Sequence, residues 1–136
     1  MSLLVTWTHA SIVDVQPMDN EHAIIMDVMN ELRLALVQGA KRGQANELLN
    51  KLIEVTGMHF WNEEQLMERY GFPGLAEHRS EHQRLLAQLA ESAHRVQQGE
   101  AVHMSDLLCF LHDSFIDHIE ALDKLYGLWM NQHGIY

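Results

Sequence analysis

Apolar residues recur every three or four positions along most of this chain, which is the spacing of α-helices that bury one face. Four segments carry the pattern, at about residues 19–38, 44–70, 74–97 and 103–131. Neither strand-like alternation nor a low-complexity tract competes with it. Four helices joined by short connections predict an all-α fold, an up-down-up-down four-helix bundle.

Local residues indicate where the first two helices begin and end. Asp19 is a candidate N-cap for the first helix, and Gly39 ends its apolar pattern. Gly71 ends the second helix. Residues 1–18 lack helical spacing and end near Pro17, so we expect an extended N-terminal arm before the bundle.

Seven histidine and acidic residues fall on the apolar faces of these predicted helices, where an unpaired polar group is costly to bury. Every helix contributes at least one of them. The pairs on the second and third helices have i,i+4 spacing, which places both side chains on one face. The seven residues are His22, His59, Glu63, His78, His82, His118 and Asp123.

Helix direction brings the seven residues to the same end of the bundle, because successive helices of an up-down bundle run in opposite directions. His22 lies near the start of the first helix, and His59 and Glu63 lie near the end of the second. The two histidines of the third helix lie near its start. His118 and Asp123 lie in the later half of the fourth. We therefore expect one buried layer of potential metal ligands.

A cation explains this set better than ordinary packing does, although a single core histidine is more often hydrogen-bonded than metal-bound. A buried carboxylate such as Glu63 would otherwise change its pKa or destabilise the fold. Five imidazoles and two carboxylates exceed one octahedral shell, whereas two ions that share both carboxylates would use all of them. Imidazole with carboxylate suits iron, manganese or zinc, and iron is the choice for dioxygen chemistry.

Composition narrows the class of protein further. The chain has 136 residues, 47% of them hydrophobic, which fits one domain, residues 1–136, with its own core. The formal net charge of -10 disfavours nucleic acid and anionic membrane surfaces as partners. The single cysteine excludes an internal disulfide and a cysteine-based cluster. Without a segment suited to spanning a bilayer, we expect a cytoplasmic protein, with a monomer favoured.

One aromatic residue and four short motifs accompany the candidate ligands. They are Trp7, DNEH at residues 19–22, HFWNEEQLM at residues 59–67, HRSEH at residues 78–82 and HIEALDKLY at residues 118–126. Together they resemble the hemerythrin family, specifically its bacterial single-domain form. The resemblance covers nearly the whole chain, and the combination of motifs is far more specific than any single HxxxE or HxxxH.

The resemblance implies a non-haem diiron centre that binds dioxygen reversibly. The implied ligands are His78, His82 and His118 for one iron, His22 and His59 for the second, and Glu63 and Asp123 as bridges. An oxo or hydroxo group would complete the bridge, and the second iron would keep an open position for dioxygen. The implied apolar walls of that position are Ile25, Phe60, Phe115 and Ile119.

Two features of the fourth helix are unusual. Relatives commonly carry Trp four residues before the fourth-helix histidine, whereas this chain has Ser114, so we expect a more open or more polar wall there. His118 and Asp123 are five residues apart, which is about 140° on an ideal α-helix. We therefore predict a local π-type widening of the helix, or a long reach by Asp123.

Other candidate groups are predicted to lie outside the centre. His112 and Asp117 repeat the spacing of His118 and Asp123. His112 lies six residues before His118, however, so the two histidines face different sides of the helix and His112 is not expected to be a ligand. The candidates expected to be solvent-exposed are Glu91, His94, Glu100, His103, His9 and His133. The methionines on the helix stripes, such as Met26, Met29 and Met67, are interpreted as core packing.

Three classes of function fit these residues. A carrier or store of dioxygen, which could supply an oxygen-consuming enzyme, needs only the bundle and is preferred, so we do not expect an enzyme. A diiron enzyme, such as a peroxidase or an iron oxidase, comes second, because the ligands do not fix access or proton delivery. A sensor comes third, since it would normally join the bundle to a signalling module.

Overall fold

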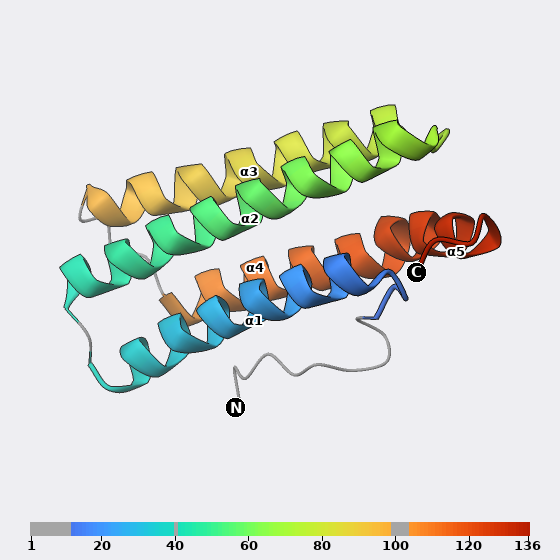
Figure 1. The fold of residues 1–136 in the computed structure, drawn as a ribbon. Helices are drawn as coiled ribbons and strands as arrows, with labels where there is room; N and C mark the ends of the chain where they lie inside the picture. Colours follow the sequence, from blue (N-terminus) through green and yellow to red (C-terminus); the bar gives the residue numbers. More distant parts are fainter. Residues whose placement is uncertain (1–11, 40, 99–103) are drawn as a thin grey trace.

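The computed structural model describes residues 12–39, 41–98 and 104–136, and the regular structure in these ranges is helical. The helices are α1 (Gln16–Val37), α2 (Arg42–Tyr70), α3 (Leu75–Gln97), α4 (Met104–His118), the π-helical η2 (Ile119–Asp123) and α5 (Lys124–Gln132). The last three follow one another without a break and form one long element. The described residues thus form four long elements, which lie side by side (Figure 1), and this confirms the predicted all-α four-helix bundle.

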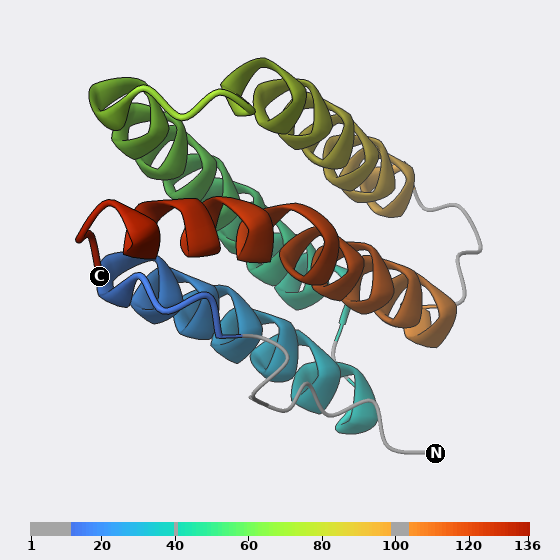
Figure 2. The same ribbon diagram turned by 90° about the vertical axis from the view of Figure 1, so that its right-hand side faces the viewer.

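Each long element lies against two neighbours. Helix α2 contacts α1 and α3, and α4 contacts the same two helices, so the four close a ring (Figure 2). Apolar side chains from all of them fill the space inside the ring. The largest fully buried ones are Tyr126, Phe60, Ile25, Leu32, Leu49, Leu52, Met67, Ile119 and Met130.

The first helix begins at Gln16, three residues before the predicted start, and Asp19 is not its N-cap. Pro17 suits the first turn, because a residue there needs no N–H for a helical hydrogen bond. The Asp19 carboxylate instead accepts hydrogen bonds from the backbone N–H groups of Val13, at 2.9 Å, and Asp14, at 3.2 Å. These bonds hold residues 13 and 14 against α1. The predicted arm of residues 1–18 is wrong for residues 16–18, which are helical. Residues 1–11, with Trp7 and His9, lie outside the described residues.

The segment before α1 also packs against α5. Gly127 of α5 lies so close to the Val13 carbonyl that a methyl group in place of its hydrogen would overlap that oxygen. The side-chain amide of Asn131 donates a hydrogen bond to the Asp14 carbonyl at 2.9 Å. These contacts join the start of the first helix to the end of the last one.

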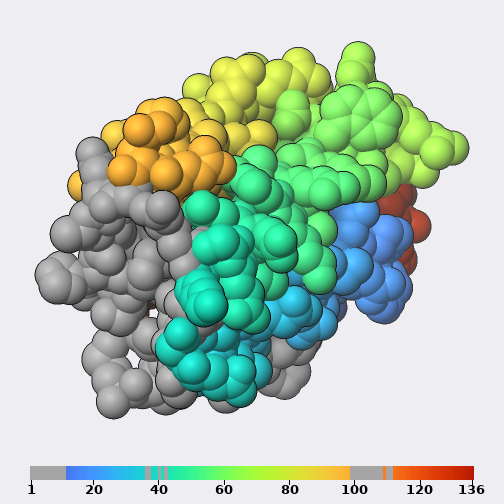
Figure 3. Space-filling view, turned by 90° about the vertical axis from the view of Figure 1, so that its left-hand side faces the viewer, coloured from blue at the N-terminus to red at the C-terminus, as the bar shows by residue number. Residues whose placement is uncertain are grey.

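The two ends of the bundle differ. The end seen in Figure 3 includes the start of α2 and the end of α3, in teal and orange. The opposite end holds the start of α1, the α2–α3 turn and α5 (Figure 1). Gly71 stops α2 there with φ 71°, a conformation that glycine adopts without strain, and Phe72 donates its N–H to the Met67 carbonyl.

The bundle is packed with methionine as predicted, since Met26, Met29 and Met67 are all buried in its core. None of the helices in the described ranges is long and apolar enough to cross a lipid bilayer.

Candidate metal centre

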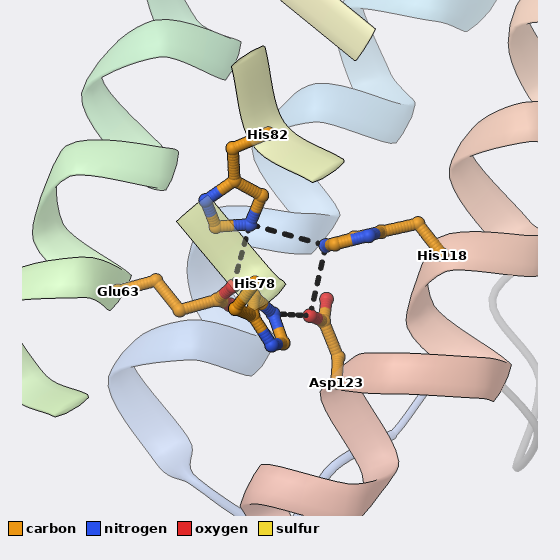
Figure 4. A group of neighbouring side chains, drawn as sticks. All are labelled: Glu63, His78, His82, His118 and Asp123. Carbon is orange, nitrogen blue, oxygen red and sulfur yellow. Dashed lines mark hydrogen bonds and ion pairs between the residues drawn. The ribbon is translucent and has the colours of Figure 1, made fainter. Parts of the chain in front are cut away.

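Seven buried polar residues from all four long elements meet at the α2–α3 turn end of the bundle. All seven are at most 3% exposed. They form two groups of metal-competent donors that share Glu63 and Asp123. The first group adds His78, His82 and His118 (Figure 4), and the second adds His22 and His59.

The first group gathers three imidazole Nε2 atoms around two carboxylate oxygens (Figure 4). His78 Nε2 lies 2.6 Å from Asp123 Oδ1 and 2.9 Å from Glu63 Oε1. His82 Nε2 lies 3.0 Å from Glu63 Oε1, and His118 Nε2 lies 3.0 Å from Asp123 Oδ1. One oxygen of each carboxylate therefore faces the three histidines.

The other oxygen of each carboxylate faces the second group. His22 Nε2 lies 3.2 Å from Asp123 Oδ2 and 3.8 Å from Glu63 Oε2. His59 Nε2 lies 3.3 Å from Glu63 Oε2. Glu63 and Asp123 thus stand between the two groups, with one oxygen toward each, which is the arrangement of carboxylates that bridge two cations.

The spacing of the donor nitrogens and the unsatisfied buried atoms fit a metal site. The Nε2 atoms of His82 and His118 are 3.1 Å apart. Two nitrogens at metal–ligand distance and at right angles around one ion would be about 3.0 Å apart. Several buried atoms in the cluster form no aligned hydrogen bond, including His22 Nε2, His59 Nε2 and Asp123 Oδ2. Because buried polar atoms are nearly always satisfied, the donor set fits cations between these atoms.

In the metal-free protein, protons take the place of cations. Burial disfavours a charged His59, but the Glu63 carboxylate and the hydrogen bond to Glu21 outweigh it and raise the pKa of His59 to about 10. Burial likewise opposes charge on His78, yet hydrogen bonds to Asp123 and Glu63 raise its pKa to about 9. Both imidazoles therefore hold a proton at neutral pH.

The two shared carboxylates remain ionised for the complementary reason. Burial opposes the charge on Glu63, but protonated His59 and the hydrogen bonds from the surrounding histidines hold its pKa well below the ordinary value. Burial and the Glu63 charge both oppose ionisation of Asp123. The positive charge and hydrogen bond of His118 overcome them and hold the pKa of Asp123 well below its ordinary value.

The fourth element places His118 and Asp123 together through a change of helix type. Residues Ile119–Asp123 form a π-helix, as predicted from the five-residue spacing. The N–H of Lys124 bonds to the carbonyl of Ile119, five residues back. Residues five apart are therefore one turn apart, so both ligand candidates face the same centre.

Three further polar residues support the cluster and were missed by the sequence analysis. Glu21 accepts a hydrogen bond from His59 Nδ1 at 2.8 Å, and Glu64 accepts one from His82 Nδ1 at 2.9 Å. The Tyr126 hydroxyl donates to Glu63 Oε2 at 3.0 Å. The available signal was position, since Glu21 and Glu64 are next to His22 and Glu63 in the chain.

The residues expected to wall the dioxygen position are all buried at the cluster end of the core, at 4% exposure or less. They are Ile25, Phe60, Phe115 and Ile119. The Phe60 ring stacks on His82 with 3.8 Å between ring centroids, and Phe115 meets His22 edge-on at 5.7 Å. Ser114, Thr56 and Gln88 line a cavity of about 30 Å³ beside these two rings. Apolar side chains, such as Leu52 and Leu89, form the rest of its lining, so Ser114 adds a polar group to a mostly apolar cavity.

The remaining histidines in the described ranges lie apart from the two donor groups. His112 Nδ1 lies 3.2 Å from the exposed carboxylate of its neighbour Asp113. His94 is exposed, and His133 is exposed and stacks on Trp129. Glu100 and His103 fall outside the described residues.

A family model and individual relatives both point to the same protein family. The model of the hemerythrin HHE cation binding domain matches residues 13–129. A bacteriohemerythrin from Methylococcus capsulatus is 34% identical over 125 residues, covering 91% of this chain and 95% of that protein. A bacteriohemerythrin from Stenotrophomonas maltophilia is 29% identical over 133 residues, covering 98% and 85%.

Solved structures agree with this result. The crystal structure of a wild-type hemerythrin superposes with a TM-score of 0.84 at 34% identity, covering 92% of this chain and 96% of that one. The family match spans all seven ligand candidates and most of the bundle. This chain therefore belongs to the hemerythrin family.

Proposed function

We propose that the seven buried residues hold two iron ions and that the protein binds dioxygen reversibly, as a carrier or store. The observation that carries the proposal is the pair of carboxylates, Glu63 and Asp123, each with one oxygen toward either donor group. Imidazole and carboxylate donors suit iron, and most of the buried core of the bundle is apolar. When bound, two ferrous ions can together supply the two electrons that reduce dioxygen to the peroxide level.

The two groups offer different numbers of donors, and this supports a role in ligand binding. The group with His78, His82 and His118 has five donor residues, whereas the group with His22 and His59 has four. A metal position with fewer protein donors keeps room for an external ligand. We therefore assign dioxygen to the His22 and His59 side.

The apolar walls would protect the bound state. Reversible binding requires that no further proton or electron reaches the ligand. Phe115 meets the His22 ring edge-on and Phe60 stacks on His82 of the other donor group, while Ile25 and Ile119 are buried in the core. None of these side chains carries a proton to donate, and the burial of His22 and His59 supports a site with little access to water.

The test is the iron content and the visible spectrum of anaerobically reduced protein, before oxygen, after oxygen and after its removal. We expect about two irons per chain, as the donor set implies, and an oxygen-dependent absorption that disappears on deoxygenation. His59→Ala should abolish the reversible change. His112→Ala, which removes a histidine outside the donor groups, should leave it intact.

Two other outcomes would contradict oxygen carriage. Iron that oxidises once and does not return to the ferrous state would favour the diiron enzyme. A protein that takes up zinc but no iron would contradict both functions.

A further inference from the structure

Glu21 and Glu64 occupy equivalent places on the two sides of the centre. Glu21 directly precedes His22 and accepts a hydrogen bond from His59 on the next helix. Glu64 directly follows Glu63 and accepts one from His82 on the next helix. A carboxylate can only accept, so His59 and His82 donate from Nδ1 and turn Nε2 toward the donor groups. Each donor group thus contains one histidine fixed by a carboxylate.

Glu21 and Glu64 differ in the group that donates a hydrogen bond to their second carboxylate oxygen. Glu64 Oε1 accepts from the Arg79 guanidinium at 2.8 Å, which compensates its negative charge. Glu21 Oε2 accepts from the neutral side-chain amide of Asn62 at 2.7 Å. The side chains of Glu21 and Glu64 are 26% and 16% exposed, so both carboxylates are mostly shielded from solvent.

We propose that Glu21 is a positioning residue whose uncompensated charge makes His59 the stronger electron donor, so that the two metal positions are electronically unequal. A carboxylate on the far nitrogen raises the basicity of a ligating imidazole. On the other side, the positive charge of Arg79 offsets the charge of Glu64, so Glu64 raises the basicity of His82 less. The inference rests on the proposed diiron centre and assigns to the His22 and His59 side the stronger preference for the oxidised state.

Three variants and one control test the inference. Glu21→Gln keeps a hydrogen-bond acceptor but removes the charge, and Glu64→Gln does the same on the other side. Arg79→Gln removes the compensating cation and, as an exposed side chain, leaves the fold undisturbed. Glu31→Gln, at an exposed position of α1 that pairs with Lys51, controls for the loss of one charge.

The primary readout is the reduction potential of the iron-loaded protein, measured by spectroelectrochemical titration. Glu21→Gln should raise it more than Glu64→Gln does, Arg79→Gln should lower it, and Glu31→Gln should leave it unchanged. A second readout is Zn²⁺ affinity in competition with a chelator. Glu21→Gln should weaken one of the two sites by roughly 10- to 100-fold.

The outcomes separate this inference from the proposed function. Two bound ions in every variant, with equal potentials for Glu21→Gln and Glu64→Gln and no response to Arg79→Gln, would overturn the inference alone. Wild-type protein that binds neither Zn²⁺ nor iron would overturn the centre and the inference together. Should Glu21→Gln fail to fold, the direction of the Arg79→Gln shift decides.

Discussion

Tyr126 carries the only hydroxyl that we find bonded to a shared carboxylate in the described part of the chain. Its ring is fully buried on α5, edge-on to Phe72 of the α2–α3 turn, and its oxygen is 3.0 Å from Glu63 Oε2. Burial and the nearby charge of Glu63 raise the pKa of Tyr126 well above its ordinary value. The phenol therefore stays protonated and acts as a permanent donor to Glu63.

Removing that donor should destabilise the protein. Tyr126→Phe keeps the ring but leaves Glu63 Oε2 with one donor fewer, and a hydrogen bond to a charged group is worth about 1.5–3 kcal/mol. We expect a loss of that size in the free energy of unfolding, measured by chemical denaturation of metal-free protein. Tyr70→Phe, at an exposed position of α2, should change it by less than about 0.5 kcal/mol.

The raised pKa values of His59 and His78 predict how the stability of the metal-free protein depends on pH. Each folded-state value exceeds the unfolded value of about 6.5, so the contribution is fully present below about pH 6.5. It is lost as the pH rises through about 9 and about 10. The melting temperature should therefore fall between about pH 6.5 and about pH 10.

Each tenfold change in proton affinity corresponds to about 1.4 kcal/mol, so the effect on calorimetric melting should be large. Zinc-loaded protein is the control, because metal ligation removes these protons and should flatten the dependence in this range. A metal-free melting temperature that rises with pH would contradict the assignment of protons to the two histidines.

At the scale of the element, residue spacing predicted the features that depend on the local sequence alone. The apolar stripes gave four helices, and the five-residue gap from His118 to Asp123 gave the π-helical segment that the structure contains. The start of α1 was missed because Asp19 resembles an N-cap, whereas its carboxylate bonds to Val13 and Asp14. Contacts of Glu21 and Glu64 could not be predicted either, because they depend on the register between neighbouring helices.

Two glycines allow a matched test of element packing. Gly127→Ala should destabilise the protein by about 1–3 kcal/mol, because the new methyl group meets the Val13 carbonyl and must push residues 12–15 away from α5. Gly57→Ala in α2 has open space and should stabilise the protein by about 0.5–1 kcal/mol. Denaturant titration of both variants measures the difference. Equal effects would show that residues 12–15 do not pack closely on α5.

For the whole molecule, the donor groups couple metal binding to folding. Ligands from α1, α2, α3 and the fourth element come together only in the folded bundle, so an ion that binds there favours folding. Within the described ranges these elements have no strand or disulfide to hold them together. Core packing and the centre at one end are the main links between them.

Metal loading should therefore raise the melting temperature. Redox-inert Zn²⁺ at about 100 times its dissociation constant would stabilise the fold by about 2.7 kcal/mol per site. Scanning calorimetry with Zn²⁺ and with excess chelator measures this, and His112→Ala should respond as wild type does. Identical melting with and without metal would show that the donor groups do not bind ions in the folded state.

The concentration of all seven ligand candidates at one end of the bundle leaves the other end available for engineering. Helix α1 ends and α2 begins there, so the connection between them lies at the end opposite the α2–α3 turn (Figure 1). Each doubling of a flexible loop costs only about 0.6 kcal/mol, so a reporter or fusion partner inserted in this connection should be tolerated. A fluorophore attached at that end would report on the protein from the end opposite the seven ligand candidates.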